Sequence, residues 1–234
     1  MRVTLWVPAA DAPRWPCVEA WLKMNAPEGC QLNFYRSLAN NIKYSWNKAV
    51  RDFLESGDDW LFSCHNDVVI HPDTLPRLLS WGLPLVSALV FQRQSPATPH
   101  VWKSYTPDQN YYALRVNDTH DWFMAHKNAI QFGPQVLEPR PDDALTPVSF
   151  TSTSCTLIHR DVLTAMSDPW FLWDDDFEGG GEDRRFFLNA AAAGYPAYVD
   201  RSCIAGHLAG DIPTGVADFM AWESVSRYEG TGEQ

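Results

Sequence analysis

Three short apolar runs constrain the fold of this 234-residue chain more than any other feature. Residues 3–7, 59–64 and 85–91 are apolar almost throughout, which is typical of strands buried on both faces. Between the first two, apolar residues recur at helical spacing over residues 41–55, and Gly57 is expected to end that helix. Alternating buried strands and helices predict an α/β fold, with a largely parallel sheet covered on both sides.

Weaker patterns continue this alternation. Further strands are expected at residues 31–35, 148–159 and 197–199, and further helices at 16–24, 73–81, 161–166 and 182–193. Asp73 is a plausible N-cap of its helix, and Gly82 its stop. Residues 92–147 differ, because they are rich in Pro, Asp, Asn and aromatic residues and contain only short strand-like pieces such as 111–116. We expect a substrate-facing insertion within a single domain.

Bulk composition excludes several classes of protein. The net charge of −11 gives no overall nucleic-acid footprint. Five scattered cysteines without a CxxC pair form neither a disulfide framework nor a zinc site, which favours a reduced, cytosolic setting. The sequence has no signal-peptide pattern and no apolar stretch near the ~20 residues of a membrane helix. A cytoplasmic protein is therefore expected.

The apolar run 59–64 ends abruptly in His65-Asn66-Asp67. Ligands of such sheets bind beyond the carboxyl ends of the strands. A carboxylate at that place suits a hard divalent cation that also holds phosphate oxygens. The alternative interpretation is a polar turn that only terminates the strand.

His207 follows Gly206 late in the chain, shortly after the expected strand 197–199. The glycine permits a close backbone approach, and neutral imidazole is a good ligand for manganese-like ions. The alternative is a buried histidine that is hydrogen-bonded to backbone.

Glu182 and Asp183 open a predicted helix. The helix dipole should lower a carboxylate's pKa there and keep it ionised, so that it can accept a proton from an attacking hydroxyl. The alternative is structural, because acidic residues are favoured in any first helical turn.

Together these segments resemble glycosyltransferases of the GT-A fold, particularly the small enzymes of bacterial and phage origin. Residues 58–70 look like the strand that bears the D-x-D-type motif, with His65 at its first position and Asp67 at its last. Residues 86–91 look like the strand after the next helix, and 151–160 like the segment leading into the acceptor half. Gly181-Glu182-Asp183 and Gly206-His207 match the last two elements of a resemblance that spans residues 1–210.

The resemblance implies a GT-A-like fold, with a Rossmann-type, mostly parallel central sheet flanked by helices. Its divisions would be a nucleotide-sugar-binding half (1–91), an inserted acceptor-side region (92–147), an acceptor and catalytic half (148–210) and a less ordered tail (211–234). It also assigns residues to roles. Asp67 and His207 would hold Mn²⁺ or Mg²⁺, and Asp183, with Glu182 as second choice, would be the base. The nucleotide, expected to be UDP, would contact Pro8, Asn40, Asn41, His65, Asn66 and Asp67.

The implied activity is metal-dependent transfer of a hexose from a UDP-sugar to a hydroxyl group. Asp183 would deprotonate the acceptor in an inverting enzyme, or orient a substrate in a retaining one. The acceptor would be a glycan or, in host cytoplasm if the chain is phage-encoded, a hydroxymethylated pyrimidine in DNA. Basic and aromatic residues of the insertion offer a track for DNA: Arg93, His100, Trp102, Lys103, Tyr105, Arg115 and Lys127. Two alternatives are a metal-dependent phosphoesterase and a catalytically silent carbohydrate-binding protein of the same fold.

Overall fold

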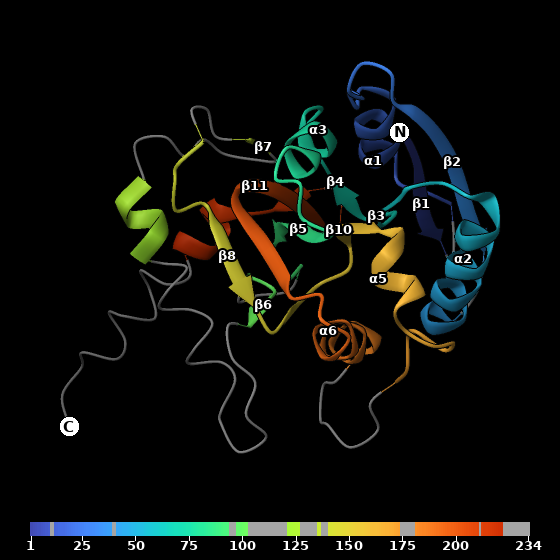
Figure 1. Ribbon diagram of the computed structural model, residues 1–234. Coiled ribbons are helices and arrows are strands. Elements are labelled where there is room, and N and C mark those ends of the chain that lie inside the picture. The colour runs from blue at the N-terminus through green and yellow to red at the C-terminus, as the bar shows by residue number, and fades with distance from the viewer. Residues whose placement is uncertain are drawn as a thin grey trace.

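The computed structural model describes residues 1–9, 12–38, 41–93, 97–102, 121–126, 135–136, 140–173, 181–210 and 212–221. They form a mixed α/β domain whose sheet lies between helices (Figure 1). The strands are β1 (Arg2–Ala9), β2 (Gln31–Leu38), β3 (Trp60–Cys64), β4 (Val68–Val69), β5 (Leu85–Val90), β6 (Val101–Trp102), β7 (Gln135–Val136), β8 (Leu145–Val148), β9 (Phe150–Thr151), β10 (Cys155–His159), β11 (Ala197–Ala209) and β12 (Ile212–Thr214). The helices are α1 (Trp15–Leu22), α2 (Ile42–Ser56), α3 (Thr74–Leu79), α5 (Arg160–Thr164) and α6 (Glu182–Ala192), with two more at 121–126 and 216–221.

The main sheet has the strand order β12-β11-β5-β10-β3-β1-β2. β1 is parallel to β2 and β3, and β5 is parallel to β11. β10 lies between β3 and β5 and is antiparallel to both, so those two strands run in the same direction. The carboxyl ends of β1, β2, β3, β5 and β11 therefore meet at one edge. This arrangement confirms the mostly parallel sheet.

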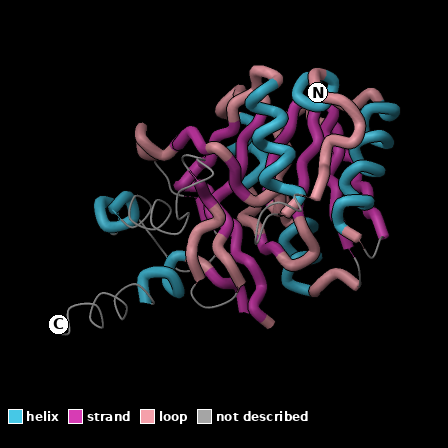
Figure 2. The backbone as a smooth tube through the Cα atoms, turned by 90° about the horizontal axis from the view of Figure 1, so that it is seen from below, coloured by secondary structure: helices cyan, strands magenta, loops and turns pink. Residues whose placement is uncertain are grey.

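Two hydrophobic cores cover the two faces of the sheet. One contains α2, α5 and α6, and the other contains α1 and α3, with the helices on opposite sides of the strands in Figure 1. In β1, Trp6 packs into the first core while Leu5 and Val7 pack into the second, as the alternation of a strand requires. In Figure 2 the strands run side by side through the molecule with helices around them.

α2 forms where the sequence predicts it. The Asn41 side chain caps its start by accepting from the Tyr44 backbone N–H at 3.4 Å, and Gly57 ends it with a φ of 73°. Trp46, among the apolar residues of its inner face, is fully buried. Asp73 is the N-cap residue of α3, as predicted, but its side chain makes no capping bond, and its Oδ1 accepts instead from Asn25 at 2.6 Å.

β11 is much longer than the expected strand 197–199. Its centre carries Asp200, Arg201 and Ser202, which are buried although polar, and its pairing with β5 is irregular between Asp200 and Ile204. Asp200 is satisfied by α3, because Arg77 Nε donates to it at 3.1 Å. His207 consequently lies inside a strand rather than beyond one.

The regions expected to be least regular contain some ordered elements. Within the insertion 92–147, β8 pairs with β11 and β6 pairs with β9, whereas residues 111–116 lie outside the described part. In the expected tail, β12 pairs with β11, and Phe219 of the last helix is fully buried. All five cysteines are free thiols. Among the described residues, no helix has the length and apolar character required to cross a bilayer.

Candidate functional site

Strand pairing brings Asp67 and His207 together. The chain leaves β3 at Cys64, passes through residues 65–67 and enters β4, which pairs antiparallel with β11 so that Val68 lies opposite His207. The Leu208 N–H also donates to the Asp67 carbonyl at 2.8 Å. The pair therefore lies at the carboxyl edge of the sheet, where ligands of such folds bind.

The His207 ring is held at both nitrogens. Nδ1 lies 3.1 Å from the Phe91 carbonyl oxygen, and Nε2 lies 3.2 Å from Oδ2 of Asp67. Because a carbonyl oxygen only accepts, Nδ1 carries a proton. Nε2 faces the carboxylate of Asp67, so a proton or a cation is needed between these two atoms.

Asp67 remains ionised in this environment. Burial alone would raise its pKa, but the hydrogen bond from His207 and the charges of His207, His65 and Arg93 lower the pKa to about 2. The side chain is 18% exposed, so part of it remains accessible to solvent.

Arg93 is a site residue that the sequence analysis assigned elsewhere, to a DNA-binding track. Its Nη1 lies 3.2 Å from Oδ2 of Asp67, the same oxygen that faces His207. Arg93 follows the carboxyl end of β5, as Asp67 follows that of β3. The signal was the expected parallel sheet, because the carboxyl ends of β3 and β5 meet at one edge even though β10 lies between these strands. Of the other track residues, Lys103, Tyr105, Arg115 and Lys127 lie outside the described residues.

His65 lies beside two tryptophan rings, with centroids 6.4 Å from those of Trp6 and Trp46. Its backbone N–H donates to the Ser154 carbonyl at 3.0 Å. Burial lowers its pKa to about 4, against the opposing effect of Asp67, so the ring is neutral at pH 7. Its Nε2 is buried and has no hydrogen-bond partner among the described residues.

The remaining predicted nucleotide contacts have mixed outcomes. Pro8 is buried near the carboxyl end of β1, opposite Ser37 of β2. Asn66 lies in the turn before Asp67, and its carbonyl accepts from the Arg14 N–H at 3.5 Å. Asn41 is exposed and caps α2. Asn40 lies outside the described residues.

Asp183 lies in the first turn of α6, as predicted, and Thr153 donates a hydrogen bond to its Oδ1. The expectation that the helix dipole lowers its pKa is wrong. Burial, together with the neighbouring charge of Glu182, raises the Asp183 pKa to about 7, although Thr153 and Ser152 oppose the rise by hydrogen bonding. Glu182 is 7% exposed, and burial raises its pKa too. Desolvation thus outweighs the dipole, whose effect at a helix end is ~0.3–1 kcal/mol.

Residues 152–154 connect the two parts of the site. Thr153, which binds Asp183, accepts at its carbonyl from the Ser63 hydroxyl of β3. The next carbonyl, that of Ser154, binds His65. The start of α6 and the end of β3 are therefore fixed to one short turn. Thr153 is a residue to which the sequence analysis gave no individual role.

The donor atoms of Asp67 and His207 fit a divalent cation. One carboxylate oxygen and one imidazole nitrogen suit Mn²⁺, and the bond from Nδ1 to the Phe91 carbonyl is the kind of support that orients a metal-binding histidine. Within the described ranges, no set of three His, Cys, Asp or Glu side chains is placed to bind a metal. Asp67 and His207 are therefore the two candidate ligands among the described residues.

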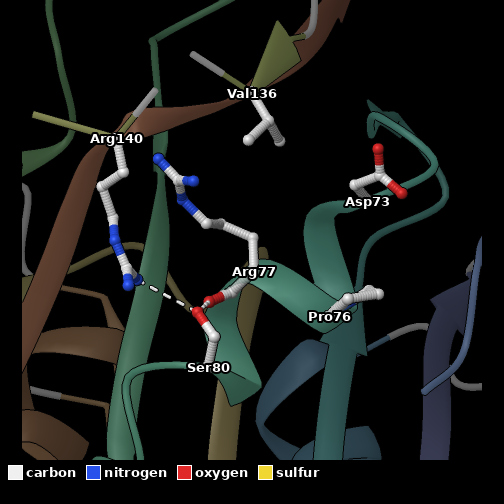
Figure 3. Close-up of a pocket in the computed structure, with 6 residues that line it drawn as sticks. All are labelled: Asp73, Pro76, Arg77, Ser80, Val136 and Arg140. Carbon is white, nitrogen blue, oxygen red and sulfur yellow. Dashed lines mark hydrogen bonds between the residues drawn. The ribbon is translucent and has the colours of Figure 1, made fainter. Parts of the chain in front are cut away.

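A separate pocket of about 390 Å³ lies beside α3 and β7 (Figure 3). Arg77 and Arg140 extend along it, and Arg140 donates to Ser80 at 3.0 Å while its guanidinium lies 3.9 Å from the Trp81 ring centre. Arg77 is neutralised by Asp200. The pocket contains none of the predicted site residues.

Several solved structures share this architecture. A197 from STIV has a TM-score of 0.55 at 18% identity, over 89% of this chain and 86% of that one. GalNAc-T7 with UDP, GalNAc and Mn²⁺ has a TM-score of 0.52 at 9% identity, over 99% of this chain and 51% of that one. The mannosyltransferase PcManGT from Pyrobaculum calidifontis, in complex with GDP-Man and Mn²⁺, has a TM-score of 0.50 at 12% identity, over 99% and 65%.

The chain has a GT-A-like fold. At these identities the likeness establishes the GT-A-like fold alone. The chain spans about half the length of GalNAc-T7 and 65% of PcManGT. No protein-family model matches the sequence, and no curated protein matches it.

Proposed function

We propose that this protein transfers a sugar, of hexose type, from a nucleoside diphosphate sugar to an acceptor hydroxyl group, with the help of a divalent cation. The observation that carries the proposal is the pairing of Asp67 with His207 at the carboxyl edge of a GT-A-like sheet. GalNAc-T7 and PcManGT, which share this fold, were solved with a nucleotide or nucleotide sugar and Mn²⁺.

In this proposal Asp67 and His207 hold Mn²⁺ or Mg²⁺. The cation, when bound, neutralises the negative charge that develops on the departing diphosphate. Asp67 is ionised at neutral pH and can bind the cation without losing a proton, because its pKa is about 2. The Phe91 carbonyl keeps the proton of His207 on Nδ1, so that Nε2 offers its lone pair.

His65 and its neighbours would bind the nucleotide, which we propose to be UDP. The Nε2 of His65 is buried and has no partner among the described residues, so a ligand hydroxyl or carbonyl would satisfy it. Pro8 and Asn66 lie at the same edge of the sheet, at or after the ends of β1 and β3.

Asp183 would act on the acceptor. A carboxylate with a pKa of about 7 is matched to proton transfer near neutral pH. In an inverting reaction the acceptor hydroxyl gives its proton to Asp183, its oxygen bonds to the anomeric carbon, and the bond from that carbon to the diphosphate breaks. In a retaining reaction Asp183 would orient a substrate, and Glu182 is the second choice for either role. We propose a glycan or a modified pyrimidine in DNA as the acceptor.

Hydrolysis of UDP-sugars in the presence and absence of Mn²⁺ tests the proposal. Slow release of UDP that requires Mn²⁺ and is lost in Asp67→Asn is the expected result. Phosphate release from simple monoesters, without any nucleotide sugar, would instead identify a phosphoesterase. No turnover of either substrate class, with glycan binding retained, would identify a carbohydrate-binding protein of the same fold.

A further inference from the structure

The guanidinium of Arg93 places a positive charge next to the Asp67 carboxylate, which is the group that would bind a divalent cation. Its Nη1 and the Nε2 of His207 both lie 3.2 Å from Oδ2 of Asp67. The Arg93 side chain is 53% exposed, whereas that of Asp67 is 18% exposed. The guanidinium therefore approaches the carboxylate from the solvent side.

Backbone hydrogen bonds of the preceding residue hold the main chain next to Arg93 in place. The preceding residue, Gln92, has its N–H bonded to the Thr98 carbonyl at 2.9 Å and its own carbonyl bonded to the Thr214 hydroxyl at 3.2 Å. Because the Arg93 side chain is half-exposed, its guanidinium can leave Asp67 for another anionic group on the solvent side.

A divalent cation on Asp67 and His207 would conflict with this contact. The cation takes the charge of the same carboxylate oxygen, and two positive charges a few ångströms apart repel each other. Arg93 must then leave Asp67. The negative group nearest to such a cation is the diphosphate that it binds, and a guanidinium matches phosphate oxygens in a two-pronged geometry.

We propose that Arg93 is a positioning residue that occupies Asp67 in the metal-free protein and moves to the nucleotide diphosphate when the cation binds. This inference rests on the proposed function and adds a coupling to it. Arg93 opposes the cation when no nucleotide is present, and strengthens nucleotide binding once the cation is in place. Cation and nucleotide binding are therefore cooperative.

Calorimetric titrations of the full chain test this coupling with Mn²⁺ alone and then with UDP at saturating Mn²⁺. Arg93→Gln should bind Mn²⁺ about two- to fivefold more tightly than wild type, because the competing ion pair is gone. It should bind UDP about tenfold more weakly, because a charge-assisted contact to phosphate is lost. Arg93→Lys keeps the charge without the fork, and should retain wild-type Mn²⁺ affinity while binding UDP more weakly. Lys23→Gln, which removes an exposed charge that is paired with Glu19 at the end of α1, should match wild type in both titrations.

The opposite signs of the two effects distinguish this role from a structural one, and thermal unfolding confirms that the variants fold. Equal or weaker Mn²⁺ binding by Arg93→Gln would overturn the inference while leaving the proposed function intact. Unchanged UDP binding would overturn it in the same way. No Mn²⁺ binding by wild type or variant would overturn the metal site itself, and the inference with it.

Discussion

The imidazole Nε2 of His207 lies 3.2 Å from the carboxylate Oδ2 of Asp67, although 140 residues separate them in the chain. The pairing of β4 with β11 brings the two side chains together, because Val68 pairs with His207 and Val69 with Gly206. Val68 is fully buried, so the short strand is also anchored in the core. The contact joins the loop after β3 to a strand from the other end of the fold, and the proposed metal site depends on that junction.

The raised pKa of Asp183 predicts that stability falls as the pH increases. The pKa in the folded protein is about 7, above the ~3.9 of an unfolded chain, so the folded state holds the proton more tightly between these values. Its contribution to stability is present below pH 4 and is lost as the pH approaches 7. Asp183→Asn has no such loss. Relative to wild type, its free energy of unfolding in urea should be higher at pH 8 than at pH 5 by about 1–3 kcal/mol.

The outcome that contradicts this prediction is an equal free-energy difference between Asp183→Asn and wild type at pH 5 and at pH 8. Such a result would show that the Asp183 carboxyl is not desolvated.

Because Nε2 of His65 has no hydrogen-bond partner among the described residues, we expect a substitution of His65 to weaken UDP binding without much change in the free energy of unfolding. Replacing His65 with Leu removes a buried polar atom that no described group satisfies, so the free energy of unfolding should change by less than about 1 kcal/mol. UDP binding should nevertheless weaken, by about tenfold, if the imidazole contacts the nucleotide. Chemical denaturation and calorimetry of the same variant provide both values. A stability loss of several kcal/mol would show that the ring is needed for packing.

Stacked aromatic rings hold Phe171, which follows α5 in the chain, in place. Phe171 stacks on Trp46 of α2 at 4.2 Å between ring centroids and on Phe186 of α6 at 4.5 Å. Asn47 adds two hydrogen bonds to the Phe171 backbone, at 2.8 and 3.0 Å. Phe171→Ala should therefore cost about 3–5 kcal/mol of unfolding free energy. The adjacent Leu172→Ala, at a side chain 36% exposed, should cost less than about 1 kcal/mol, and equal losses in urea denaturation would contradict this account.

The sequence was sufficient to predict elements whose signals are local. α2 has helical spacing, a capping residue and a terminal glycine within 17 residues, from Asn41 to Gly57, and it forms as expected. The buried strands β3 and β5 are continuous apolar runs. The α/β fold with a mostly parallel sheet follows from the order of such elements. The GT-A-like fold was implied by the family resemblance, and the structural comparisons confirm it.

The failures have long-range causes. β11 continues through Asp200 because Arg77, 123 residues earlier, neutralises that carboxylate inside the protein. The pKa of Asp183 depends on burial, which a first-turn position does not reveal. Arg93 looked like one of several surface cations until the sheet placed it beside Asp67. For β11 and Arg93 the deciding partner is distant in the chain, and for Asp183 the deciding factor is burial by the packed fold, so the local sequence pattern alone does not reveal these outcomes.

Calorimetric titration of UDP into wild type and Asp67→Asn, with and without Mn²⁺, is the most direct test of the central claim. The substitution keeps the size of the side chain and removes the ionised carboxylate. We predict that wild type binds UDP tightly only with Mn²⁺, and that Asp67→Asn loses this dependence together with most of the affinity. Equal UDP binding by both proteins, or none by wild type in the presence of Mn²⁺, would contradict a nucleotide-sugar site at Asp67 and His207.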